Sequence, residues 1–484
     1  MLTRTLLAAA TTWKWYVLGQ VLMLEKEPRT GGNSAWANSG INFLTPEEGD
    51  SPSTFKADTL ESGGGLCKPE LDSSQDAQQF LAALGVDLGG VAQTGGQSVP
   101  RTHSPPAGGP AVGEAIMAAL QRSVAQQANV EVRTGLRVTG LSRSEGTSGS
   151  VWHVKFDASG GTTGAGTGSG SSAGSGAGTS SSGTAHSMHS QPRALPRQES
   201  LQAQAVVLAT GGFAASQALL ERYAPYAAGL GTTNGGFATG EGLLLAQQAG
   251  AAAVDLQWVQ LNPTGIVEPH GGGDGGGGDG GPKTVAPEKL RGLGAILLNS
   301  EGRRFVNELG RRDEVAGAIL QQPHQQAVLL LGSQTAAQFG PAALEPYLSQ
   351  GLMQRAENLQ QLAAATAMPE QRLREELEGY NLAAAAGRDA FGKTAFLAPI
   401  DLQGPLVWVR VAPVAHYCMG GVAVDSRAQV LGEDGRHIPG LFAAGEVAGG
   451  VHGKNLLVGN SLLECIVFGK IAGTSAAAYA LHTP

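Results

Sequence analysis

Residues 416–462 combine side chains and turns that could hold an anionic cofactor. The stretch opens with His416 and a glycine pair at 420–421, continues through an apolar strand that closes on Glu446, and ends in a second glycine cluster before a helix. Unpaired backbone N–H groups and the dipole at the start of a helix both stabilise a bound anion. The pattern predicts a cofactor site made of a strand end, a glycine turn and a helix N-terminus.

A second pattern pairs an acidic with a basic residue. Glu288 and Arg291 are three residues apart, which puts both side chains on one face of a helix. A pair at this spacing is usually a surface salt bridge, so the spacing alone assigns it no function.

Four blocks follow one another along the chain. They are LEKEPRTGGNSAWANSGINF (24–43), VVLATGGF (206–213), RGLGAILLNSEGRRFVNELGRRD (291–313) and the 416–462 stretch. Together they resemble the soluble fumarate reductase family of FAD-dependent oxidoreductases. The resemblance covers nearly the whole chain and is less specific for the substrate than for the family.

The order of strand-like and helix-like segments agrees with this family. VLMLEK (21–26) has the pattern of a buried parallel strand, and helices are predicted over 239–253, after a capping-type Thr-Gly-Glu, and over 460–480, after the N-cap pair Asn460-Ser461. Alternation of this kind indicates an α/β fold with a parallel sheet.

The resemblance adds a domain division. It implies a Rossmann-like FAD-binding domain at 1–256 and 416–484, split by an α+β capping, or clamp, domain at about 257–415.

Glu25 is the first cofactor candidate, because an acid at the end of the second strand of a dinucleotide fold accepts hydrogen bonds from a ribose hydroxyl. In membrane-bound relatives a histidine near Asn33 is linked covalently to the flavin, so Asn33 implies noncovalent FAD. By resemblance the flavin contacts are Glu25, Lys26, Gly31, Gly32, Asn33, Ser34, Ser39, Gly40, Ile41, Thr210, Gly211, Gly212, Glu241, Glu446, Asn460, Ser461 and Leu462.

The resemblance also implies a reaction. Hydride passes from the reduced flavin to one alkene carbon of fumarate, giving succinate, and a proton passes to the other carbon. Arg312 matches the proton donor of the family, Glu288 and Arg291 match its relay, and His416 matches the histidine that binds a substrate carboxylate.

Two positions depart from the family. Asn262 stands where a substrate-binding histidine is expected, and Leu456 stands where an arginine usually clamps a carboxylate. Lys454 is close enough in sequence to replace that arginine, but only as a point charge. An unsaturated substrate with one carboxylate or none, such as an enoate or a ketosteroid, is therefore an alternative to fumarate.

The glycine-rich phosphate loop of dinucleotide folds is a further departure. Such a GxGxxG loop should precede VLMLEK by about a helix length, yet Gly19 is the only glycine before Met23. We therefore expect that the sequence is incomplete or that the cofactor site is reworked. A truncated, non-catalytic relative without flavin is the remaining hypothesis.

Two stretches have the composition of insertions. Residues 158–198 are dominated by Gly, Ser, Thr and Ala, and residues 271–281 read GGGDGGGGDGG. Neither can bury enough apolar surface to offset its conformational entropy, so both are predicted to be flexible loops. The first is expected to lengthen a hairpin, and the second to be a surface expansion rather than an active-site lid.

The composition of the chain indicates which binding partners and cofactors are to be expected. A formal net charge of −8 gives no reason to expect nucleic acid, and three scattered cysteines exclude a haem-c attachment motif or a four-cysteine iron–sulfur site. We therefore expect no bound metal and an external electron donor, either a reduced flavin or an NADH-linked reductase.

No uninterrupted apolar run is long enough to predict a membrane span, and the opening MLTRTLLAAATTWKW fits a targeting peptide poorly. A soluble cytoplasmic or mitochondrial protein is the expectation.

Overall fold

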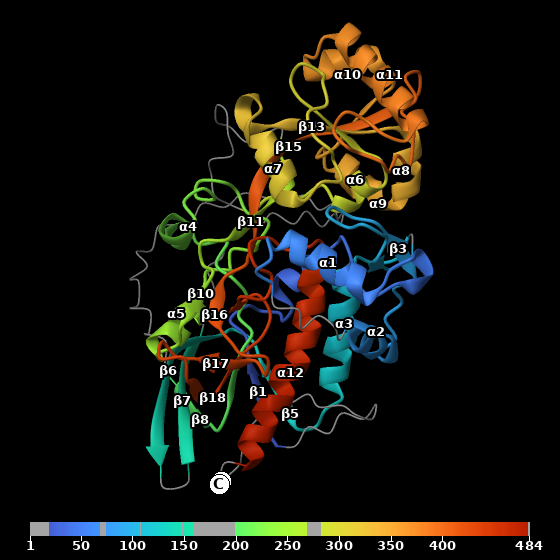
Figure 1. Ribbon diagram of the computed structural model, residues 1–484. Helices are drawn as coiled ribbons and strands as arrows, with labels where there is room; N and C mark the ends of the chain where they lie inside the picture. Colours follow the sequence, from blue (N-terminus) through green and yellow to red (C-terminus); the bar gives the residue numbers. More distant parts are fainter. Residues whose placement is uncertain are drawn as a thin grey trace, which may run out of the picture.

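The computed structural model describes residues 19–67, 74–106, 108–146, 149–158, 199–268 and 282–482. The predicted flexible loops at 158–198 and 271–281 lie almost entirely outside these residues, and so does most of the stretch where a phosphate loop was expected. Figure 1 shows an upper lobe, coloured yellow to orange, and a larger lower body.

Short parallel pairs form the dinucleotide-type part of the lower body. β1 (Val21–Leu24) pairs with β5 (Val130–Arg133), and β9 (Val206–Leu208) pairs with β18 (His437–Ala443). β17 (Gln429–Leu431) extends the second pair in antiparallel fashion. The parallel strand predicted at 21–26 is therefore confirmed, although it ends two residues earlier.

An antiparallel sheet flanks the first insertion. β6 (Leu136–Gly146) pairs with β7 (Gly149–Ala158), and β7 pairs with β8 (Glu199–Ala203). The insertion thus connects two paired strands, as predicted. The partner of β7 is β8, however, because β9 belongs to the parallel pair with β18.

A five-stranded antiparallel sheet is centred on the upper lobe. The long strand β15 (Leu406–Cys418) pairs with β11 (Val259–Ile266) and with β13 (Ala327–Leu331). β12 (Ile296–Leu298) and β14 (Gln354–Ala356) complete the sheet. β11 and β15 extend from this lobe toward the lower body (Figure 1).

The remaining strands are short. They are β2 (Ile41–Asn42), β3 (Gly90–Ala92), β4 (Thr102–Ser104), β10 (Ala253–Val254), β16 (Gly421–Ala423) and β19 (Ala448–Gly449). The helices of the lower body are α1 (Pro52–Ser62), α2 (Ser74–Ala83), α3 (Val112–Ala125), α4 (Gln217–Tyr223), α5 (Glu241–Gln248) and α12 (Asn460–His482), with the 3-10 turns η1 (Gly32–Trp36) and η2 (Pro46–Glu48). Those of the upper lobe are α6 (Glu288–Gly292), α7 (Arg312–Leu320), α8 (Ser333–Phe339), α9 (Pro341–Ser349), α10 (Leu359–Thr366) and α11 (Glu370–Ala386), with η4 (Pro323–Gln325).

Both helices predicted in the lower body are present. α5 is shorter than the predicted 239–253, and the chain turns at Gly250, whose φ is +90°. Its N-cap is Gly240, with no side-chain cap hydrogen bond, so the predicted capping by Thr239 is wrong.

α12 matches the helix predicted over 460–480. In the part of the chain that the structure describes, it is the one helix whose length and composition would allow it to cross a membrane, and half of that stretch is buried inside the protein. Glu464 and Lys470 interrupt its apolar residues, which is why the sequence did not suggest a span.

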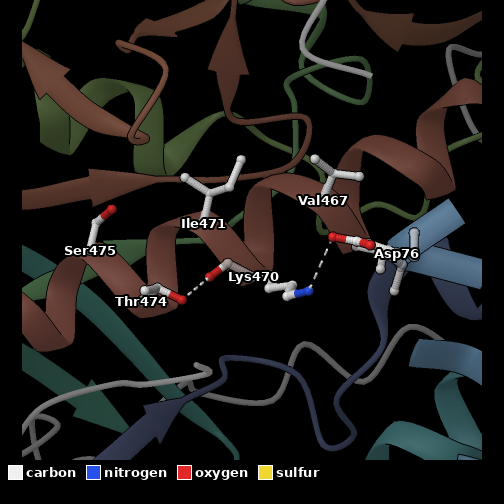
Figure 2. A pocket seen from close by; sticks show the side chains of 8 residues that line it. Asp76, Val467, Lys470, Ile471, Thr474 and Ser475 are labelled. Carbon is white, nitrogen blue, oxygen red and sulfur yellow. Dashed lines mark hydrogen bonds and ion pairs between the residues drawn. The ribbon is translucent and has the colours of Figure 1, made fainter. Parts of the chain in front are cut away.

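A groove of about 270 Å³ lies between α2 and α12 (Figure 2). Its lining includes Ala77, Val467 and Ile471, and Lys470 Nζ lies 3.9 Å from a carboxylate oxygen of Asp76. None of the residues predicted to act in chemistry lines this groove.

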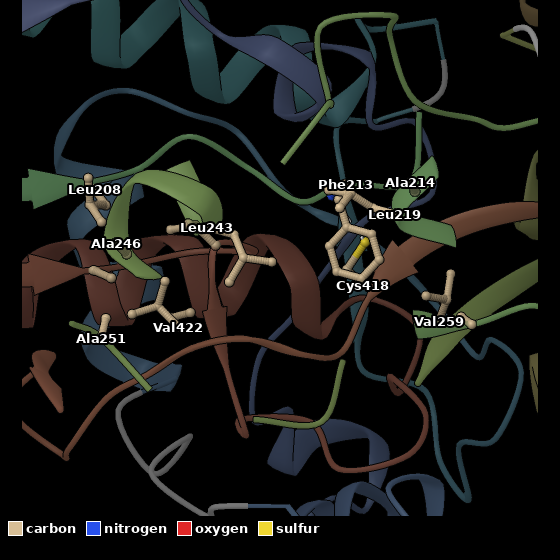
Figure 3. Packing of buried hydrophobic residues seen from close by; sticks show 14 of the residues in the cluster. Leu208, Phe213, Ala214, Leu219, Leu243, Ala246, Ala251, Val259, Cys418 and Val422 are labelled. Atoms are coloured by element: carbon tan, nitrogen blue, oxygen red, sulfur yellow. Dashed lines mark hydrogen bonds between the residues drawn. The ribbon is translucent and has the colours of Figure 1, made fainter. Parts of the chain in front are cut away.

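The core of the lower body packs around the end of β15. Figure 3 shows Phe213, Leu219 and Val259 around Cys418, and the backbone N–H of Phe213 donates to Cys418 Sγ at 3.2 Å. This packing fixes the segment after β9 against the strand that carries His416.

Candidate active site

The residues predicted to handle protons form one buried cluster. Glu288 and Arg291 lie on α6, and Arg312 is the first residue of α7. Arg291 forms an ion pair with Glu288, and Arg312 Nε lies 3.1 Å from the second oxygen of the same carboxylate. The predicted placement of Glu288 and Arg291 on one helical face is confirmed, and one carboxylate holds both guanidinium groups.

Burial and charge oppose each other in this cluster. Burial would raise the pKa of Glu288, but the charges of Arg291 and Arg312 outweigh it and hold that pKa below its usual value. Burial also lowers the pKa of Arg312, and Glu288 offsets this only in part. The carboxylate is thus kept ionised beside a guanidinium that releases its proton more readily than an exposed one.

Gln260 is a residue of this cluster that the sequence did not reveal. It is buried on β11, and its Oε1 accepts a hydrogen bond from Arg312 Nη1 at 2.7 Å. Its Nε2 donates to the backbone oxygen of Leu456 at 2.7 Å. An amide within an apolar strand belongs to no motif, so only the fold brings it to Arg312.

His416 occupies a bulge in the β11–β15 ladder. Gln260 pairs with Tyr417 and Leu261 pairs with Ala415, so His416 has no partner residue on β11. A bulge re-aims the extra side chain and is common beside functional sites. Burial, followed by the charge of Arg312, holds the pKa of His416 well below its usual value, so the imidazole is neutral.

The imidazole is oriented by a neighbour that the sequence also did not reveal. His416 Nδ1 and Thr233 Oγ1 are 2.7 Å apart. If Nδ1 accepts the hydroxyl proton of Thr233, Nε2 carries the ring proton and is a hydrogen-bond donor.

The two positions that depart from the family are both buried. Asn262 Oδ1 accepts from the backbone N–H of Thr264 at 2.9 Å and from its hydroxyl at 3.1 Å. Leu456 is 1% exposed and packs with Trp258, Tyr417 and Met419. One side chain is thus engaged with its own strand, and the other belongs to an apolar cluster.

The predicted flavin loop at 31–34 is tied to the strand that carries His416. Gly31 and Gly32 have φ of +126° and +49°, and Asn33 Nδ2 donates to Asn234 Oδ1 at 2.5 Å. Asn234 Nδ2 in turn donates to the backbone oxygen of His416 at 2.8 Å. Ser34 lies within η1, and this turn is therefore fixed relative to the proposed substrate histidine.

Glu446 lies where β9 and β15 approach each other. Its Oε1 accepts from the backbone N–H of Cys418 at 2.9 Å, and a Cβ at Gly212 would meet the same oxygen at 2.5 Å. Only glycine therefore fits at 212. A Cβ at Gly211 would meet no atom within 4 Å, and Thr210 is exposed, so open space adjoins the end of β9.

Glu25 and Glu241, two acidic residues among the predicted flavin contacts, have different partners. Glu25 Oε1 accepts from the backbone N–H of Glu27 at 2.9 Å. Lys26 Nζ lies 3.0 Å from Glu241, which also pairs with Arg137. Lys26 therefore joins the end of β1 to the start of α5, a connection that the sequence did not predict.

Gly40 and Ile41 pack against the neighbouring strand β4, whereas Ser39 is partly exposed. A Cβ at Gly40 would lie 2.3 Å from a methyl carbon of Thr102 and 2.7 Å from a backbone oxygen of His103. Ile41 begins β2, which pairs with β4. The close approach of β4 accounts for Gly40 without a cofactor.

The start of α12 is likewise engaged within the protein. Asn460 accepts from Asn42 at 2.8 Å and donates to Thr59 at 3.3 Å. Leu462 is buried in the core of the lower body, and Ser461 is partly exposed. Within the described ranges, no three His, Cys, Asp or Glu side chains are grouped so that they could hold a metal ion.

Glu446 should make stability depend on pH in the protein freed of cofactor. Burial raises the pKa of Glu446 from 4.5 to about 7, and the N–H of Cys418 offsets this only in part. The folded state then binds more protons than the unfolded state between these values, so stability falls as pH rises through this window. We expect a loss of about 3 kcal/mol, because each pKa unit corresponds to about 1.4 kcal/mol.

Urea unfolding at a series of pH values measures this effect. Glu446→Gln should flatten the profile between pH 4.5 and 7, whereas Glu433→Gln, at an exposed position, should leave it unchanged. Equal slopes in the wild type and Glu446→Gln would show that another group is responsible.

Comparison with known proteins identifies the family of the chain. The model of the family described as FAD binding domain matches residues 7–462. A fumarate reductase of Schizosaccharomyces pombe is 33% identical, over 96% of this chain and 86% of its own length. An NADH:acrylate oxidoreductase of Vibrio harveyi is 34% identical over 56% of this chain and 26% of its own length.

A solved structure has the same fold. The open conformation of a flavocytochrome c3 fumarate reductase superimposes with a TM-score of 0.68 at 30% identity, over 96% of this chain and 74% of that one. The buried Arg–Glu–Arg cluster, the bulged histidine and the glycine-rich strand ends thus occur in a chain whose sequence and fold agree with the same family. The chain belongs to the FAD-binding domain family and is a fumarate-reductase-like, FAD-dependent oxidoreductase that acts on CH–CH bonds.

Proposed function

We propose that the protein binds FAD noncovalently and reduces the carbon–carbon double bond of an unsaturated carboxylate, the class to which the fumarate named for its relatives belongs. The observation that carries the proposal is the buried contact of Arg312 with Glu288, beside a neutral His416. A surface salt bridge would not combine burial, a lowered guanidinium pKa and a neighbouring bulged histidine.

The residues at the strand ends fit a flavin. The turn at Gly31 and Gly32 and the open space beside Gly211 would allow the backbone to approach a flat ring or a phosphate. Glu446 would accept a hydrogen bond from a ribityl or ribose hydroxyl. When bound, FAD supplies the hydride that one alkene carbon receives.

The protein side chains handle the matching proton. Arg312 donates it to the other alkene carbon, and Glu288 and Arg291 restore the proton to Arg312. The ionised Glu288 orients and stabilises the guanidinium before transfer, because it accepts from Arg312 Nε at 3.1 Å, and the neutral guanidine left after transfer is then reprotonated. His416 donates from Nε2 to a substrate carboxylate, since Nδ1 is engaged by Thr233.

The domain division follows the same proposal. Residues 1–256 and 416–484 form the FAD-binding domain, and residues 257–415 form a capping domain that supplies Arg312 and its relay. The five-stranded sheet of the upper lobe supports this division, because β11 and β15 connect it to the body at residues near both proposed boundaries.

Electrons are proposed to come from an external donor, either a reduced flavin or an NADH-linked reductase. A soluble location in the cytoplasm or mitochondria, without membrane or nucleic acid partners, is part of the proposal. The activity test supplies purified protein with FAD and chemically reduced free flavin, and measures the saturated acid formed from fumarate and from monocarboxylate enoates. Product from none of them would contradict the proposed function.

The flavin should be released on denaturation. Asn33 has no nucleophilic ring nitrogen and is engaged by Asn234 and Gly235. Acid precipitation of the yellow holoenzyme should leave all the colour in the supernatant. Colour that stays with the precipitated chain would contradict noncovalent binding.

A further inference from the structure

We infer that the substrate carries one carboxylate and an apolar group at the other end of its double bond, so that a monocarboxylate enoate is a better substrate than fumarate. The inference rests on the proposed function and specifies its substrate class. It is carried by the charge count around Arg312 and by the apolar cluster that adjoins Gln260.

The buried charges match one anion. Arg312, Arg291 and Glu288 are 5%, 1% and 2% exposed and together carry one net positive charge. His416 adds none, because its imidazole is neutral. One substrate carboxylate balances this charge, whereas a second would be buried without a partner.

Neighbouring cations are already paired. Glu308 binds Arg304 and Lys393, and Arg304 also pairs with Asp389, so this buried cluster is neutral as a whole. Arg311, the residue before Arg312, is engaged by Asp313 and Glu314. Neither group offers an unbalanced positive charge to a second carboxylate.

An apolar cluster lies on the far side of Gln260, beside the buried amide of Asn455, whose Oδ1 accepts from Gln260 Nε2 at 2.7 Å. Gln260 accepts from Arg312 and donates to the backbone oxygen of Leu456, so one residue connects the guanidinium to this region. There Leu456 packs with Trp258, Tyr417 and Met419. These four residues, here called the apolar wall, would stabilise a methyl or alkyl substituent and would not solvate a carboxylate.

Buried polar residues near the wall offer no unbalanced positive charge, because His452 Nε2 lies 2.7 Å from a carboxylate oxygen of Glu464, which also accepts from the Tyr417 hydroxyl. Asn262 Oδ1 accepts from Thr264, so this amide could offer a carboxylate only neutral N–H donors from Nδ2, which would not balance a second negative charge. Lys454 is exposed, and its ammonium lies 5.3 Å from the centre of the Trp258 ring. Lys454 is the rival candidate for a second carboxylate and is therefore tested directly.

The experiment compares substrates that differ in one charge. Holoenzyme and reduced free flavin are supplied with fumarate, monomethyl fumarate and crotonate, and kcat/KM is measured for each. We expect both monocarboxylates to exceed fumarate about ten- to a hundredfold, which is the typical effect of one charge-assisted contact. A preference of the wild type for fumarate would overturn the inference.

Substitutions test whether Leu456 causes the expected preference for monocarboxylates. Leu456→Arg should raise kcat/KM for fumarate about ten- to a hundredfold and lower it for crotonate. The matched control Leu382→Arg, at a position 72% exposed on α11, should change neither. Efficient fumarate reduction that is lost in Lys454→Met would overturn the inference, because Lys454 would then be the second clamp. If no alkene at all is reduced, the proposed function fails and the inference fails with it, a result distinct from a preference for fumarate.

Discussion

Arg312→Lys is expected to keep the flavin bound and to lose about 10²–10⁴-fold of alkene reduction, the range typical of a lost acid–base catalyst. A lysine carries the charge but not the fork that contacts Glu288 through Nε and Gln260 through Nη1. Glu288→Gln should also slow turnover, because a neutral amide cannot return a proton to Arg312. The measurement is kcat with a saturating enoate, together with the flavin content of each variant.

The neighbouring residue provides a matched control. Arg311 lies one position earlier, is partly exposed and pairs with Asp313 and Glu314 rather than Glu288. Arg311→Lys should therefore turn over at nearly the wild-type rate. Near-native rates in both Arg312→Lys and Glu288→Gln would mean that the proton comes from another group.

Glu308→Gln is expected to reduce the free energy of unfolding by about 3–5 kcal/mol, because it leaves buried cations without their partner. Glu308 is fully buried and binds Arg304 at 2.7 Å and Lys393 at 2.9 Å. The charges of Lys393 and Arg304 hold the pKa of Glu308 below its usual value, although burial would raise it.

Urea unfolding of the full chain, followed by circular dichroism, measures this loss. Glu378→Gln on α11 makes the same chemical change at an exposed position and should alter stability by less than about 0.5 kcal/mol. Equal stabilities for the two variants would show that the buried network is not a net contributor.

Features that depend on neighbouring residues in the sequence could be predicted from the sequence. Glu288 and Arg291 meet because three residues span about one helical turn, and α12 begins at the predicted Asn460. The strand at 21–26 and the hairpin around the first insertion were also predicted, because period and composition determine them. The meeting of Arg312 with Glu288 came from the family resemblance, since 24 residues separate them.

Contacts between distant segments could not be predicted. Gln260 and Thr233 have no motif, and His416 reaches its position through a register shift that depends on the pairing of β11 with β15. Gly40 stays a predicted cofactor contact, but the close approach of β4, which the sequence could not show, is by itself a reason for a glycine there. Glu241 was assigned likewise, and its partners Lys26 and Arg137 lie more than 100 residues away.

The apolar wall is another set of contacts that could not be predicted from the sequence. Leu456 was recognised in the sequence as a departure, but its packing with Trp258 and Met419 depends on the fold. Only this packing indicates that Leu456 is part of an apolar surface. The sequence alone would also allow Lys454 to replace the missing arginine there.

The most direct test of the central claim is a single-turnover experiment with the reduced holoenzyme. The bound flavin is reduced chemically without oxygen, excess reductant is removed, and the protein is mixed with crotonate or fumarate while the absorbance of oxidised flavin is recorded. The account predicts that this absorbance returns with one saturated acid formed per flavin, and that Arg312→Lys slows its return by about 10²–10⁴-fold. A flavin that stays reduced with every alkene, or one that is reoxidised equally fast in Arg312→Lys, would contradict it.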